Sequence, residues 1–112
     1  MSFFERLFQP KPGSKAYRVQ MAQKFNNLWL ESVTERVDNE EILVGKNGSI
    51  SIKDKTFIVC CEGKVIFEGN TEEITVSELM SRNGVIISGF DEERGDTRTL
   101  VAHFSYYRKL DN

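Results

Sequence analysis

The sequence has few of the residues on which catalysis and metal binding most often depend. Its 112 residues include one histidine, His103, and two adjacent cysteines, Cys60 and Cys61. Neighbouring residues on a strand point to opposite faces, so these two thiols are not placed to form a disulfide or to share a metal ion. We interpret them as small, buried or half-buried side chains in a reducing compartment.

Motifs for nucleophilic catalysis and phosphate binding are also missing from the sequence. It contains no G-x-S-x-G elbow and no glycine-rich turn between a strand and a helix. We expect residues 45–48, Gly-Lys-Asn-Gly, to form a β-turn between strands. The acidic residues 91–96 lack the spacing of an EF-hand loop, so a solvated hairpin tip is expected there rather than a cation site. The sequence therefore predicts a protein that is not an enzyme and that uses no metal or cofactor.

Long apolar runs are absent as well. No stretch approaches the roughly 20 apolar residues needed to cross a bilayer, and residues 1–13 lack the pattern of a secretory signal. We therefore expect a cytoplasmic protein. Apolar residues make up 39% and charged residues 29% of the chain, a balance typical of a globular domain rather than a disordered chain. The formal net charge of -2 gives no overall support for nucleic-acid binding.

The charge is unevenly distributed along the chain. Residues 1–24 hold five basic side chains and one acidic side chain, a net charge of +4, whereas the remaining residues hold ten basic and sixteen acidic ones, a net charge of -6. A basic N-terminal section on an acidic body is one arrangement that favours contact with anionic surfaces.

The start of the chain is unusually rich in large apolar side chains. If this stretch is helical, four of them lie on one side within about one turn and form what we call the N-terminal arm: Phe3, Phe4, Leu7 and Phe8. A hinge, Gln-Pro-Lys-Pro-Gly, follows, because each proline restricts itself and the residue before it. We predict an arm and hinge over residues 1–13 and a single α+β domain over residues 14–112.

The apolar side chains of the arm need a surface that covers them, since so short a helix is marginal in water. Three surfaces remain open as interpretations. The arm can fold back on its own domain, dock on a partner protein or a second copy of the chain, or bind a membrane surface with the help of its basic residues.

The clearest pattern after the hinge is helical. Ser14 is a good N-cap, and residues 15–37 contain neither glycine nor proline. The apolar residues that fall at helical spacing are Tyr17, Met21, Phe25, Leu28, Trp29 and Val33. We therefore predict one helix over residues 15–37.

Beyond the helix the apolar period changes to that of strands. Short strands are expected at residues 41–45, 49–52, 56–61, 64–67, 73–76, 85–88 and 97–107, with one helical turn over residues 77–82 as an alternative. Glu62-Gly63 and Asn83-Gly84 are turn dipeptides, and the connections are too short for parallel crossovers. The prediction is an α+β fold, with an N-terminal helix packed on a mostly antiparallel twisted sheet or small β-roll of six to seven short strands. This order resembles the strand-rich rolls of the PH-like superfold, although the helix comes last there.

The last predicted strand has bulky residues on both faces. Leu100, Ala102 and Phe104 alternate with Val101 and His103. A strand of this kind is central, or its second face meets a helix or a partner. We name His103 and Tyr107, on that second face, as further candidates for partner binding.

Together these features predict a non-catalytic protein-interaction module whose N-terminal arm or exposed strand edge contacts a partner protein or a second copy of the chain. The candidate partner-binding residues are Phe3, Phe4, Leu7, Phe8, His103 and Tyr107. One alternative is a peripheral membrane or lipid-binding module that uses the same arm. A further alternative is single-stranded nucleic-acid binding through residues 106–109, Tyr-Tyr-Arg-Lys, which the acidic body disfavours.

Overall fold

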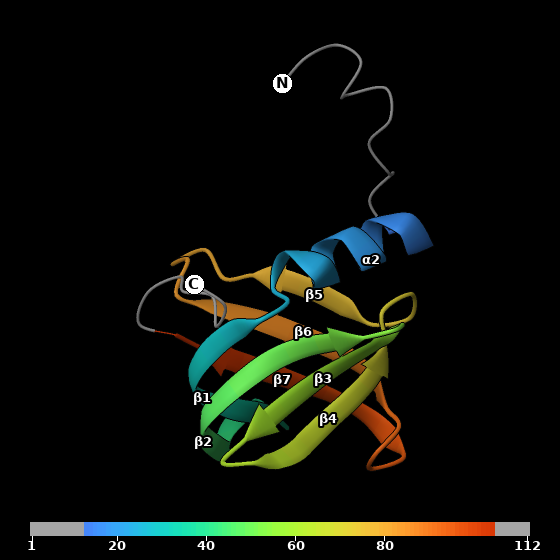
Figure 1. Ribbon diagram of the computed structural model, residues 1–112. Helices are drawn as coiled ribbons and strands as arrows, with labels where there is room; N and C mark the ends of the chain where they lie inside the picture. Colours follow the sequence, from blue (N-terminus) through green and yellow to red (C-terminus); the bar gives the residue numbers. More distant parts are fainter. Residues whose placement is uncertain (1–12, 105–112) are drawn as a thin grey trace.

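The computed structural model describes residues 13–104, which form one helix and a seven-stranded sheet. The elements follow one another as α2 (Lys15–Lys24), β1 (Leu28–Val37), β2 (Glu40–Lys53), β3 (Thr56–Cys61), β4 (Lys64–Asn70), β5 (Thr75–Glu78), β6 (Gly84–Asp91) and β7 (Asp96–His103). The strand order is β4-β3-β2-β1-β7-β6-β5, and the paired strands run antiparallel. The predicted α+β class is therefore confirmed (Figure 1).

Helix α2 begins where the sequence predicts, but it ends much earlier. The Oγ of Ser14 accepts a hydrogen bond from the backbone N–H of Tyr17 at 3.2 Å, which confirms the N-cap. The prediction of a helix as far as residue 37 is wrong after Lys24. Asn27 adopts a φ of 62°, a left-handed conformation that asparagine tolerates better than most residues. The chain then continues as β1, whose aromatic and β-branched residues favour a strand.

Strands β1 and β2 form a long hairpin that the sequence analysis did not anticipate. Asp38 and Asn39 are its turn, with φ values of 49° and 67°, the left-handed conformations that a two-residue hairpin turn requires. The expected β-turn at residues 45–48 is wrong, since all four residues lie within β2. A β-bulge opposite Val33 and Thr34 lets β2 continue through this glycine-containing stretch.

The other hairpins largely agree with the sequence. Glu62 and Gly63 form the predicted turn between β3 and β4, with φ values of 53° and 80°. Residues 77–82 do not form a helical turn, because β5 extends to Glu78 and a loop follows. The prediction that the last strand is central is confirmed, since β7 pairs with both β1 and β6.

The sheet curls so that β4 approaches β6, and this brings the two ends of the sheet close together in an open roll (Figure 1). The backbone N–H of Glu92 donates to the carbonyl oxygen of Glu68 at 2.7 Å across this gap. Ile74 packs against two glycines, and a Cβ added at Gly69 or Gly89 would lie 2.6 or 2.8 Å from its Cγ2. Only glycine allows the strands to approach so closely at these two positions.

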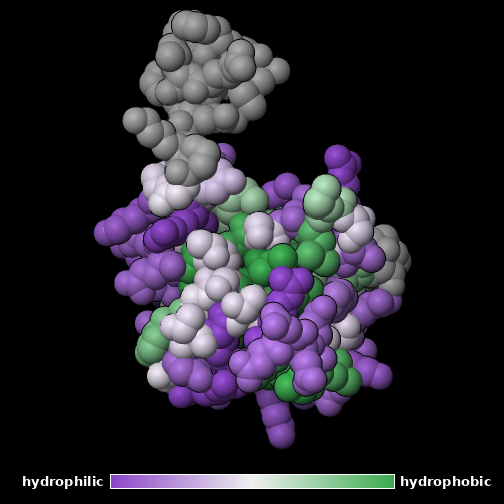
Figure 2. Space-filling view, turned by 180° about the vertical axis from the view of Figure 1, so that it is seen from behind, coloured by the Kyte–Doolittle hydropathy of each residue, from purple (hydrophilic) through white to green (hydrophobic). Residues whose placement is uncertain are grey.

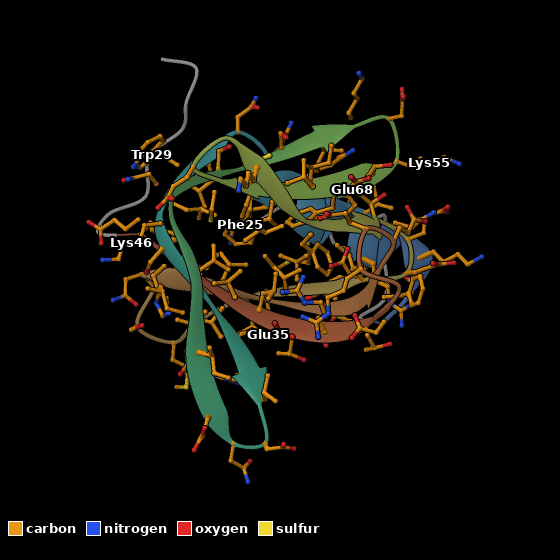
Figure 3. The ribbon with its side chains drawn as sticks, turned by 90° about the horizontal axis from the view of Figure 1, so that it is seen from below. Phe25, Trp29, Glu35, Lys46, Lys55 and Glu68 are labelled. Atoms are coloured by element: carbon orange, nitrogen blue, oxygen red, sulfur yellow. The ribbon has the colours of Figure 1, made fainter. Side chains whose placement is uncertain are left out.

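The hydrophobic core fills the interior of the roll. Helix α2 contributes Ala22, and Phe25 at its C-cap lies inside the roll (Figure 3). The inward face of β7 contributes Leu100 and Ala102, and Phe104 follows, as predicted. The largest fully buried side chains are Phe25, Phe57, Phe67, Leu28, Leu30, Ile50, Ile74, Ile87 and Leu100. Cys61 is buried and Cys60 half-buried, which confirms that prediction.

Candidate interaction site

The N-terminal arm and Tyr107 lie outside the described residues. The structure does show where the arm joins the domain. Gly13, the first described residue, lines a surface groove between the start of α2 and the edge strand β5. The arm is therefore attached directly beside a concave surface.

This surface, which we call the helix–edge groove, has a volume of about 170 Å³. Its lining residues are Gly13, Tyr17, Arg18, Met21, Thr75, Val76 and Ser77. Tyr17 and Met21 lie four positions apart on α2, so they stack on the same side of the helix. Val76, which is buried, forms the apolar wall on β5. The groove thus combines apolar side chains with the exposed polar residues of a strand edge.

Two further features make the helix–edge groove suitable for a polypeptide. Among residues 13–104, β5 pairs with β6 alone, so its second edge has no strand partner. The Nε of Arg18 is buried and has no hydrogen-bond partner within the same residues, although its Nη1 donates to the carbonyl oxygen of Glu72 at 3.4 Å. A buried donor without an acceptor is costly to the domain.

His103 lies away from the residues that line the helix–edge groove. It is half-buried on β7, opposite Ser32 of β1 and Gly84 of β6. Its Nε2 is 3.8 Å from the Oε1 of Glu41, and that oxygen accepts a 2.7 Å hydrogen bond from the hydroxyl of Thr34. The structure therefore does not bring His103 together with the attachment point of the arm.

A buried ionic cluster is the largest feature that the sequence analysis missed. We call it the seam cluster: Glu35 of β1, Asp91 of β6 and Arg98 of β7, with exposed fractions of 8%, 0% and 7%. Arg98 donates from Nη1 to Asp91 at 2.7 Å and to the carbonyl oxygen of Ile66 at 2.6 Å. It also donates from Nη2 and Nε to Glu35 at 2.8 and 3.2 Å. The cluster joins β4 to β6 across the gap in the roll.

The seam cluster corrects the view of residues 91–96 as a wholly solvated tip. Asp91 is fully buried, and its Oδ1 accepts hydrogen bonds from the backbone N–H groups of Glu68 and Glu93 at 3.1 and 2.9 Å. Arg94 is half-exposed and bonds both Asp96 and Glu35. One sequence signal was present, because Arg98 is in phase with Leu100 and the other inward residues of β7.

The geometry of the seam cluster shifts the pKa values of its acids. The hydrogen bonds from Arg98 outweigh desolvation and lower the pKa of Glu35 below its ordinary value. Burial acts to raise the pKa of Asp91, but the hydrogen bonds from Arg98 and from backbone N–H groups lower it overall. Both carboxylates are therefore held in the charged form, and the cluster is a closed set of ion pairs.

The described residues contain little that suggests other chemistry. Within residues 13–104, no three histidine, cysteine, aspartate or glutamate side chains gather as metal ligands would. Burial raises the pKa of both the Cys60 and Cys61 thiols, which disfavours the reactive thiolate. No helix in this part of the chain is long and apolar enough to cross a membrane.

Comparison with models of known protein families, with curated protein sequences and with solved structures finds no match for this chain. Its function has to be argued from the residues themselves.

Proposed function

We propose that this protein is a non-catalytic interaction module that self-associates by exchanging its N-terminal arm. The apolar residues of the arm in one copy dock in the helix–edge groove of a second copy. The observation that carries the proposal is the position of Gly13, which belongs both to the lining of the groove and to the hinge that carries the arm.

The size of the helix–edge groove supports an aromatic occupant. Its volume is about 170 Å³, and an apolar cavity of about 150 Å³ accommodates a benzene ring. One phenylalanine ring of the arm therefore fits between Tyr17, Met21 and Val76. The backbone of the bound arm can then pair with the free edge of β5.

The hinge favours docking on a second copy over docking on the same domain. Phe8 is the arm residue nearest to Gly13, and Gln-Pro-Lys-Pro separates the two. Prolines favour the extended polyproline conformation, with a rise of about 3.1 Å per residue, which would carry Phe8 about 15 Å from Gly13. Because Gly13 itself lines the groove, a hinge that adopted this conformation would favour docking of the arm on a second copy.

Reciprocal exchange gives the dimer the stabilisation of two arm–groove contacts. A symmetric dimer contains two identical arm–groove contacts. Full burial of one phenylalanine contributes roughly 1.5–3 kcal/mol before the cost of ordering the arm. The two contacts together contribute about 3–6 kcal/mol against the entropy lost when two chains associate.

Removal of the arm's aromatic side chains tests the proposal directly. We expect Phe4→Ser together with Phe8→Ser to lower the mass of the assembly in sedimentation velocity, because the groove then loses its occupant. The thermal midpoint of the domain should stay within a few degrees of the unmodified chain. Unchanged mass combined with a lower midpoint would show that the arm packs on its own domain instead.

A mixing experiment separates exchange from every form of docking within one chain. Ser77→Arg places a long charged side chain on an exposed lining residue and should block the groove without disturbing the core. The arm variant and the groove variant should each lose the association that depends on the arm, yet an equimolar mixture should regain it through one intact contact. No change in mass on mixing contradicts arm exchange.

Flotation with anionic liposomes addresses the membrane alternative. A self-associating module should remain in the dense fraction with or without residues 1–13. Flotation of the full chain, but not of a chain that begins at Ser14, would instead assign the arm to a lipid surface.

A further inference from the structure

A second unpaired edge lies in the middle of the sheet. Strand β2 pairs with β1 along nearly its whole length, but within the described residues it pairs with β3 only from Gly48 to Lys53. Residues 40–46 of β2 therefore have one edge without a strand partner. We call this stretch the free β2 edge.

The free β2 edge belongs to the part of the β1–β2 hairpin that projects from the body (Figure 3). Its apolar side chains are unusually exposed, with exposed fractions of 51% for Ile42 and 55% for Leu43, and 40% for Val37 on the neighbouring strand. On the face seen in Figure 2, apolar side chains lie among polar and charged ones. A two-stranded ribbon with exposed apolar residues is only marginally stable in water, so a further strand would stabilise it.

The charges of the free β2 edge indicate which strand fits it. Its sequence is Glu-Glu-Ile-Leu-Val-Gly-Lys, with Glu40 and Glu41 at one end, Leu43 at the centre and Lys46 at the other end. Two antiparallel copies of such a segment place acidic residues opposite a basic one at both ends. Opposite charges directly across an antiparallel pair are favourable, and like charges are unfavourable.

We propose that the free β2 edge pairs with the same edge of a second copy of this chain, about a two-fold axis at Leu43. The interface is independent of the arm exchange proposed above, because it uses neither α2 nor β5. The residues opposite one another are then Glu40 and Lys46, Glu41 and Gly45, Ile42 and Val44, and Leu43 and Leu43. The exposed side chains of Ile42 and Leu43 lie near the centre and the ion pairs lie at the two rims, while Val44 packs against the core of its own domain.

The neighbouring structure fixes this register. At one end, the turn at Asp38 and Asn39 stops the strand. At the other end, the backbone N–H of Glu62 donates to the carbonyl oxygen of Asn47 at 3.2 Å and closes the edge. An antiparallel copy can use the whole free edge only when Leu43 lies on the axis. The bulge at Val44 of each copy lies opposite Ile42 of the other, on the two sides of the axis.

A cysteine at the proposed axis tests the register. Directly opposite residues in an antiparallel pair have Cα atoms about 4.5–5.5 Å apart, within the range of a disulfide. We expect Leu43→Cys to give a covalent dimer on mild oxidation of the full chain. Val37→Cys is the matched control, being similarly exposed on the same hairpin but away from the axis, and it should give no more dimer than the unmodified chain with Cys60 and Cys61. Equal yields from the two variants would overturn the proposal.

Charge exchange gives a second test, made in a chain that begins at Ser14 so that the arm does not contribute. Lys46→Glu should raise the dimer dissociation constant about tenfold, because two symmetric ion pairs become repulsive. Adding Glu40→Lys to the same chain should restore association, whereas Lys53→Glu, the same charge change outside the free edge, should have little effect. Failure of the double exchange to restore association, or an equal effect of Lys53→Glu, rejects the pairing. The pairing is also rejected if the unmodified chain that begins at Ser14 stays monomeric at millimolar concentration.

Discussion

The edge strand β4 meets β6 across a seam of buried charge, whereas the edge strand β5 lies beside α2 with an apolar groove between them. At the seam, Arg98 bonds two carboxylates and a backbone carbonyl, so its donors are used within the domain. At the helix–edge groove, the Nε of Arg18 is buried without an acceptor in the described part of the chain. The same residue type thus has its donors satisfied at one edge and, within residues 13–104, one donor unsatisfied at the other.

The difference shows which side of the roll can change its contacts. A buried ion pair must stay intact, because separation of its members leaves charges in a medium that cannot solvate them. When a segment enters an apolar groove beside a free strand edge, no hydrogen bond or ion pair within the domain has to be broken. The seam therefore fixes the fold, and a segment docked in the groove, as we propose, would leave the seam undisturbed.

The largest effect is expected from breaking the seam. Arg98→Met keeps most of the apolar volume of the side chain but leaves Glu35 and Asp91 buried without their partner. We expect the free energy of unfolding to fall by about 3–5 kcal/mol in urea titrations. Arg94→Ala is the control, since Arg94 is half-exposed and its ion pairs should contribute less than about 1 kcal/mol. Similar losses of unfolding free energy in the two variants would mean that burial does not determine how much these ion pairs stabilise the domain.

A smaller and reversible loss is expected from acid. The pKa values of Glu35 and Asp91 are lowered in the folded state. Their contribution to stability is therefore complete above the unfolded values, near pH 4, and is lost as the pH falls toward the folded values. Urea midpoints measured between pH 7 and pH 2.5 should decline in this acid range. The slope should be much weaker in Arg98→Met, and equal slopes would assign the acid sensitivity to other groups.

The smallest effects are expected on the side of α2. Ser14→Ala removes the hydrogen bond to the N–H of Tyr17, so the domain should lose about 1 kcal/mol of stability. Lys24→Gln removes an ion pair with Glu78 between partly exposed side chains, and a loss below about 0.5 kcal/mol is expected. Thermal unfolding of both variants would rank them. If either variant lost as much free energy of unfolding as Arg98→Met, the contacts at the two edges would contribute equally to the stability of the domain.

Local sequence signals predicted most of the sheet. The Glu62-Gly63 turn and the inward residues of β7 follow from turn chemistry and from a period of two, and both are decided within a few residues. The end of α2 was missed because asparagine, rather than glycine or proline, breaks the helix. Asn27 takes a left-handed conformation, and the Oδ1 of Asn26 accepts a hydrogen bond from the backbone N–H of Ile52 at 2.8 Å. That second contact joins residues far apart in sequence and could not be seen locally.

The sites were less predictable than the strands. The seam cluster draws Glu35, Asp91 and Arg98 from three strands, and only the register of the sheet brings them together. The helix–edge groove depends on α2 lying beside β5, a tertiary contact that no local pattern encodes. The sequence did predict an apolar arm with a hinge, and that prediction of a docking role stays a prediction.

The seam cluster also bears on how the chain finds its native pairing. Its members are far apart in the sequence, from residue 35 to residue 98. Contacts between such distant residues form slowly, so we expect the cluster to assemble after the local hairpins. If β7 slipped by one residue, Arg98 would point to solvent and two carboxylates would be stranded among hydrocarbon side chains. A roll with this misaligned strand would be much less stable than the native one. The cluster therefore favours the native register of β7.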